Sequence, residues 1–156
     1  MRSFFLSCLC VLTLAPFVSA QVPGPGVVRA FTDAARAARA AVCQSQPHYI
    51  LMVEAQKQAQ LQASLDVQGH QQWSRRYQHL QQRFGFEYTF NEICAETWGR
   101  QANLPPRLLC DEFFFCWRQS EGHWRIASWR HTFYGCGMAQ GLSGRWYGCI
   151  IVADRK

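Results

Sequence analysis

FYGCGMAQGLSGRWYGCIIVA, residues 133–153, is the stretch of sequence from which the fold can be predicted. Two runs rich in aromatic and apolar residues, 133–140 and 145–153, flank the turn-forming sequence GLSG. This pattern predicts a β-hairpin. If GLSG is the loop, Cys136 lies directly opposite Cys149 on the neighbouring strand. Cross-strand neighbours are close enough for a disulfide, so we expect these two cysteines to be bridged.

This register sorts the side chains of the hairpin onto two faces, and both faces are apolar. One face is expected to carry Tyr134, Cys136, Met138, Tyr147, Cys149 and Ile151, and the other Phe133, Ala139, Trp146, Ile150 and Val152. A sheet that is apolar on both faces has to be covered on both. Because helices are predicted upstream, we expect an α/β fold of three layers, an α/β/α sandwich around a central, mostly antiparallel sheet.

Four helices are predicted before the hairpin. Residues 27–42 are rich in alanine, and residues 49–68 carry small residues at helical spacing before a glycine that would end the helix. Residues 92–98 are expected to form a short helix capped by Asn91. A fourth helix opens at Pro106 and presents an apolar stripe of Leu109, Phe113, Cys116 and Trp117. The ten glutamines of residues 56–82 are interpreted as a solvated polar helix face.

The N-terminus indicates export. Residues 1–20 carry an early arginine, an apolar run too short to span a bilayer, and a small-residue ending, as in a cleaved secretory signal. Residues 21–26 are expected to be a flexible leader and residues 27–156 a single domain. Six cysteines lie after residue 20, an even number that favours disulfides in a secreted or periplasmic protein. A zinc cluster is the weaker interpretation, because the chain has no Cys-x-x-Cys pair.

The net charge of +6 at pH 7 comes almost entirely from arginine. These arginines are spread along the chain rather than clustered, so nucleic acid is not an expected partner, and polyanion binding through the arginines is only a third, weaker hypothesis. Arg75 and Arg76, beside Trp73, are candidates for stacking or anion binding, although a solvated helix face also explains them.

Two histidines and two carboxylates are the candidates for chemistry. His70 and His123 are expected in loops, and Glu92 and Glu96 on one face of the short helix. Two imidazoles and a carboxylate suit a divalent metal or a general acid/base pair. Each of these residues also has a structural interpretation, namely a hydrogen-bonded histidine or a favourable charge at a helix N-terminus. His131 has no motif around it and is expected at the surface or in a loop.

Other catalytic classes lack their signatures. The chain contains no Gly-x-Ser-x-Gly turn for a nucleophilic serine, and no glycine-rich turn between a strand and a helix for phosphate binding. The tryptophans are expected to lie in the core rather than to form a ligand platform.

Several motifs together resemble the CAP superfamily of cysteine-rich secretory proteins, antigen 5 and pathogenesis-related proteins, especially its exported bacterial branch. These motifs are WRQSEGHWRIA at residues 117–127, YGCGMA at 134–139, the strand RWYGCIIVA, and the alanine-rich helix with its following Gly-His step. The resemblance extends from residue 27 to residue 153.

The resemblance implies an α/β/α sandwich with a cavity lined by two histidines and acidic residues, where divalent metal is found in several members. By position, the two histidines are His70 and His123. It also implies a bridge between Cys136 and Cys149. Two of the family's acidic positions differ here, since Glu92 is offset by one residue and Ser120 replaces the other acid. Zinc or another divalent metal is therefore expected to be held weakly, partly by water.

The sequence thus predicts an exported, monomeric CAP-domain protein that binds rather than catalyses. The resemblance implies a central cleft, and the partner would be an extracellular protein, a lipid or another apolar ligand. The alternative is a metal-assisted hydrolase in which Glu92 or Glu96 takes part, acting on an extracellular peptide, glycan or nucleic acid.

Overall fold

The computed structural model describes residues 23–97 and 104–156 of the 156-residue chain. In chain order its elements are helix α1 (Pro25–Ala37), the 3-10 helix η1 (Ala41–Gln44), strand β1 (Gln46–Pro47), helices α2 (Tyr49–Leu65) and α3 (Trp73–Phe84), strand β2 (Tyr88–Glu96), helices α4 (Pro106–Arg118) and α5 (Glu121–Ser128), and strands β3 (Phe133–Gln140) and β4 (Trp146–Arg155). The expected signal at residues 1–20 lies outside the described residues.

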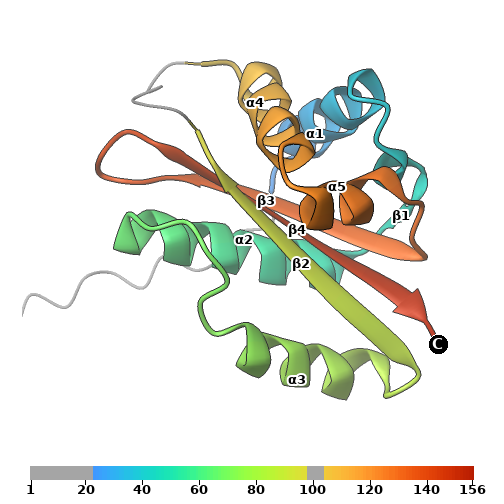
Figure 1. The fold of residues 1–156 in the computed structure, drawn as a ribbon. Coiled ribbons are helices and arrows are strands. Elements are labelled where there is room, and N and C mark those ends of the chain that lie inside the picture. Colours follow the sequence, from blue (N-terminus) through green and yellow to red (C-terminus); the bar gives the residue numbers. More distant parts are fainter. Residues whose placement is uncertain (1–22, 98–103) are drawn as a thin grey trace, which may run out of the picture.

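The four strands form one mixed sheet in the order β1-β3-β4-β2. β3 and β4 are antiparallel, β2 and β4 are antiparallel, and only the two-residue β1 runs parallel to its neighbour β3. Helices cover both faces: α1, α4 and α5 lie on one side, and α2 and α3 lie on the other (Figure 1). The predicted α/β/α sandwich with a mostly antiparallel sheet is confirmed.

The hairpin is confirmed, but its predicted register is wrong by one residue. Arg145 joins the loop, where its carbonyl accepts a hydrogen bond from the Gly141 amide, and the strands resume at Gln140 opposite Trp146. Cys136 therefore lies opposite Ile150, and Gly137 lies opposite Cys149.

The observed register also makes the predicted Cys136–Cys149 disulfide wrong. A one-residue slip moves a side chain to the other face of the sheet. Cys136 is buried in the core between the sheet and the layer of α1, α4 and α5, whereas Cys149 is buried in the core on the α2 side. The sheet itself separates the two thiols, and all six cysteines of residues 23–156 are free thiols in this structure.

The two glycines of the YGCGMA motif allow α2 to lie directly on β3. A Cβ atom at Gly135 would meet the backbone of Leu51, and one at Gly137 would lie 2.5 Å from the Cα of Gln56. The facing stripe of α2 is also small, with Ala55 and Ala59 fully buried. The Gly-Cys-Gly sequence is thus explained by close packing of a helix on a strand.

Beyond the end of β1, a side chain of α2 takes over the hydrogen bonding of β3. The Gln56 amide donates to the Met138 carbonyl at 3.0 Å, and its oxygen accepts from the Met138 amide at 3.1 Å. The interpretation of the glutamines as a solvated face is therefore wrong for three of them, since Gln56, Gln58 and Gln62 are buried.

The expected short helix at residues 92–98 is also wrong, because residues 88–96 form strand β2. Pairing with β4 along its whole length outweighs the local capping signal of Asn91, as tertiary contacts commonly outweigh propensity. Residues two apart in a strand share a face, so Glu92 and Cys94 project from the same side of β2.

The other three predicted helices form with shifted ends, and α3 and α5 were not predicted. α1 begins at Pro25, inside the expected flexible leader, and ends at Ala37 rather than at residue 42. α4 begins at Pro106 as predicted, and Trp117 near its end is fully buried. Asp66 in the left-handed conformation ends α2, three residues before the glycine expected to do so. No helix among the described residues is both long and apolar enough to cross a membrane.

Candidate metal centre

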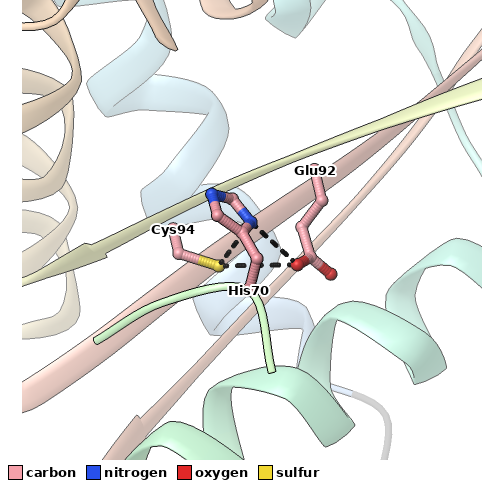
Figure 2. A group of neighbouring side chains, drawn as sticks. All are labelled: His70, Glu92 and Cys94. Carbon is pink, nitrogen blue, oxygen red and sulfur yellow. Dashed lines mark hydrogen bonds and ion pairs between the residues drawn. The ribbon is translucent and has the colours of Figure 1, made fainter. Parts of the chain in front are cut away.

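The candidate site lies where the loop after α2 crosses β2. His70 belongs to this loop, and its Nδ1 atom lies 3.0 Å from Oε1 of Glu92 on β2. Figure 2 shows the imidazole above the strand, facing both Glu92 and Cys94. Glu92 thus lies beside His70, as expected from the sequence, although it is carried by a strand rather than by the expected helix.

Buried polar contacts fix the loop that carries His70. The side chain of Gln58, which is fully buried, donates to the carbonyl of Gly69 at 2.5 Å. The side-chain oxygen of Gln62 accepts from the Gly69 amide at 3.1 Å. Two glutamines of α2 thus hold the residue next to His70, which positions the imidazole over β2.

Arg76 on α3 holds the carboxylate of Glu92. Its Nε lies 2.8 Å from Oε2 and its Nη2 lies 3.0 Å from Oε1, a two-pronged ion pair. The Glu92 side chain is 1% exposed and the Arg76 side chain 7%. The interpretation of Arg76 as part of a solvated helix face is therefore wrong. Arg75, its neighbour, is exposed.

Cys94 is the third member of the group. Its Sγ lies 3.9 Å from His70 Nδ1 and 3.9 Å from Glu92 Oε1. Hydrogen bonds to Cys94 and Glu92 raise the pKa of His70 to about 10. A hydrogen bond with Cys149 and a smaller one with His70 lower the pKa of Cys94. One ligand atom from each of His70, Glu92 and Cys94 lies within 4.8 Å of the others, close enough to hold one metal ion.

His123 approaches the same loop from the other layer. It lies in the first turn of α5 rather than in the expected turn, because the helix already begins at Glu121. The ring centroids of His70 and His123 are 6.1 Å apart. Burial, together with the charge of His70, lowers the pKa of His123. The structure therefore brings together the two histidines that the sequence singled out.

The 6.1 Å between the two ring centroids lies below the upper limit for one shared ion. An ion bound at about 2.0–2.1 Å from a ring nitrogen lies about 3.2 Å from that ring's centroid, so two rings can share it up to a separation of about 6.4 Å. Nδ1 of His70 contacts Glu92, so Nε2 is the ring nitrogen that would bind a metal, and it has to lose its proton first because the pKa of the ring is about 10. Histidine ligands are commonly oriented by a carboxylate on the second nitrogen in this way.

A pocket of about 220 Å³ adjoins His123. It is lined by Gln68, Cys94, Ala95, Glu96, Thr97, Cys116, Trp117 and His123. The indole nitrogen of Trp117 is fully buried and has no hydrogen-bond partner among the described residues. A larger hollow of about 700 Å³ lies between α2 and α3. Arg75, Arg76 and His79 are among the residues that line it, and His123 is not.

Glu96 is separate from the group of Glu92 and His70. Its carboxylate lies 3.4 Å from Nη1 of Arg145 and is 39% exposed. It shares the lining of the pocket with His123, which gives it access to a ligand there.

His131 lies in the loop between α5 and β3, as one of its two expected settings has it, but it is buried rather than at the surface. It is 8% exposed, and its ring contacts an oxygen of Asp154 at 2.6 Å and the Ile126 carbonyl at 2.8 Å. These contacts join the end of β4 to α5 and give His131 a structural role. Sequence reasoning also missed Cys94, whose only signal was its position two residues after Glu92.

Comparisons with known proteins do not extend this description. No protein-family model matches the chain, and the search of curated proteins finds no match. The site is therefore interpreted from its own geometry.

Proposed function

We propose that this chain is an exported binding module of the CAP type, whose cleft holds a divalent metal between His70 and His123 and presents it to a partner or ligand. The observation that carries the proposal is the convergence of these two imidazoles, from the α2–α3 loop and from α5, at a ring separation of 6.1 Å.

Glu92 suits an orienting role better than a ligand role. Both of its oxygens already accept hydrogen bonds from Arg76, which neutralises the charge that would attract a metal. Its contact with Nδ1 sets the ring orientation of His70 and directs Nε2 away from β2. A metal bound by two imidazoles alone is held weakly and keeps positions for water or for a group from the ligand.

The decisive experiment is zinc titration by calorimetry of the wild type, His70→Ala, His123→Ala and His79→Ala. His79 is the matched control because it is a half-exposed histidine that also contacts a buried glutamate, Glu54. We expect one site in the wild type and in His79→Ala, and a loss of at least tenfold in affinity in the other two. Equal zinc affinity in all four proteins would refute the shared site.

A metal-assisted hydrolase is the second candidate, and the position of Glu96 favours it. A carboxylate that lines the same pocket as His123 is placed to accept a proton from a water molecule in that pocket. Zinc-loaded protein would then cleave peptide, glycan or nucleic-acid substrates. Cleavage should fall at least a hundredfold in Glu96→Gln while zinc affinity stays unchanged. An absence of turnover by the zinc-loaded wild type leaves binding as the function.

A further inference from the structure

Two cysteines face each other across neighbouring strands. Cys94 on β2 and Cys149 on β4 are direct partners in the antiparallel register. Both side chains point into the core on the α2 side of the sheet, where they are 1% and 0% exposed. The neighbouring thiol of Cys149 also lowers the pKa of Cys94.

This arrangement is close to that of a disulfide. The Cβ atoms of directly opposed residues in antiparallel strands lie about 4.5–5.5 Å apart, and a disulfide needs about 3.5–4.5 Å. A local closure of about 1 Å therefore suffices, with no change of register.

The other described cysteines lie in different surroundings. Cys110 and Cys136 are buried in the core on the α1 side, and Cys43 and Cys116 pack against that same core. Cys116 is the rival partner of Cys94, because both line the pocket beside His123. However, Cys116 belongs to α4 in the opposite layer, and its Sγ contacts the Glu96 carbonyl at 3.5 Å.

We propose that Cys94 and Cys149 form a disulfide during oxidative folding. In the first step the thiolate of one cysteine attacks a small-molecule disulfide such as oxidised glutathione, and one thiol is released. In the second step the other cysteine attacks the mixed disulfide and releases the second thiol. Two protein thiols are oxidised and one external disulfide is reduced to two thiols. Because both sulfurs are buried in the folded chain, the exchange takes place before β2 has docked on β4.

The disulfide also selects the ligands of the metal, and this second step rests on the proposed function. A sulfur bonded to Cys149 is no longer a thiolate, and only the thiolate is a metal ligand. The oxidised protein then has Nε2 of His70 and His123 for a metal. The reduced protein also offers the group of His70, Glu92 and Cys94, in which Cys94 Sγ lies 3.9 Å from Nδ1 of His70.

The bond is tested directly by peptide mapping. The reduced, denatured chain is refolded in a glutathione redox buffer, free thiols are alkylated, and a non-reducing digest is analysed by mass spectrometry. We expect a Cys94–Cys149 linked peptide in the wild type and in the matched control Cys136→Ala, which removes a buried cysteine of β3 from the opposite face. Wild-type protein that refolds with both thiols alkylated, or with Cys94 joined to Cys116, would overturn the proposal.

The consequence for the metal has its own readout, cobalt(II) absorption. Reduced protein should show a sulfur-to-cobalt charge-transfer band that is absent from the oxidised protein and from reduced Cys94→Ala. A band of equal strength in oxidised and reduced protein, or no band in either, would overturn the ligand role of Cys94. Peptide mapping needs no metal, and the zinc titration of the histidine variants needs no thiol, so failure of the disulfide and failure of the proposed function are told apart.

Discussion

The substitution Gly137→Ala tests the close packing of α2 on β3. The new Cβ atom would lie 2.5 Å from Gln56 Cα and 2.6 Å from the carbonyl carbon of Ala55. Both are backbone atoms, so rotation of a side chain cannot relieve the overlap. To reach ordinary contact at about 3.5 Å, the helix has to move away from the sheet by about 1 Å, and overpacking of this kind costs about 1–3 kcal/mol or more.

The cost at Gly137 is expected to reach or exceed the upper end of this range. Movement of α2 also stretches both hydrogen bonds between Gln56 and Met138, each worth about 1 kcal/mol. We therefore expect a loss of about 3–5 kcal/mol in the free energy of unfolding, a large part of the 5–15 kcal/mol typical of a domain.

Urea denaturation followed by tryptophan fluorescence and circular dichroism measures this loss. Gly26→Ala is the control, because a Cβ atom there meets nothing within 4 Å. Gly148→Ala should fall between the two, since its Cβ would lie 2.7 Å from a ring atom of Phe113, a side chain that can shift. A loss below about 0.5 kcal/mol in Gly137→Ala would refute the packing argument.

Two further predictions concern buried and surface charges. Arg76→Met leaves the buried carboxylate of Glu92 without its main partner, which should lower the free energy of unfolding by about 3–5 kcal/mol. The control Arg75→Met changes an exposed side chain and should alter stability by less than about 0.5 kcal/mol. In urea denaturation, the double variant Arg76→Met/Glu92→Gln should recover part of the loss. Equal effects of Arg75→Met and Arg76→Met would contradict the buried pair. Asp66 has a carboxyl pKa below its usual 3.8, chiefly because it accepts a hydrogen bond from the Ser143 hydroxyl. The ionised carboxylate therefore stabilises the fold fully above about pH 3.8, and this contribution is lost as the pH falls through the lowered pKa. The difference in melting temperature between wild type and Asp66→Asn should be present at pH 6 and should close below pH 3.8; a difference independent of pH would count against this role.

The layers of the fold could be predicted because apolar residues on both sides of a hairpin require two covering layers. The register could not, because the sequence GLSG does not say whether Arg145 belongs to the loop or to the strand. Residues 92–96 were misassigned for a related reason. Asn91 is a good helix cap in isolation, yet the partner strand β4 offers nine paired positions to residues 88–96.

The two histidines of the candidate site could be selected from the sequence through their motifs, but their partners could not. Arg76 looks like any arginine on a polar helix until α3 is placed beside β2. Cys94 was considered only as a source of disulfides, and its position next to His70 depends on the strand that replaced the expected helix. Long-range pairing decided these contacts, and local sequence carries little information about it.

The hydrogen bonds of Gln56 have a consequence for how molecules of this protein meet one another. Among the described residues, β1 pairs with only the first two residues of β3, so the rest of that strand is an edge of the sheet. Such an edge is a template on which a second chain can add a strand and begin an aggregate. The amide of Gln56 imitates the missing neighbour and satisfies the backbone of Met138 from within the same chain. A single side chain thereby protects this edge at Met138 against strand addition.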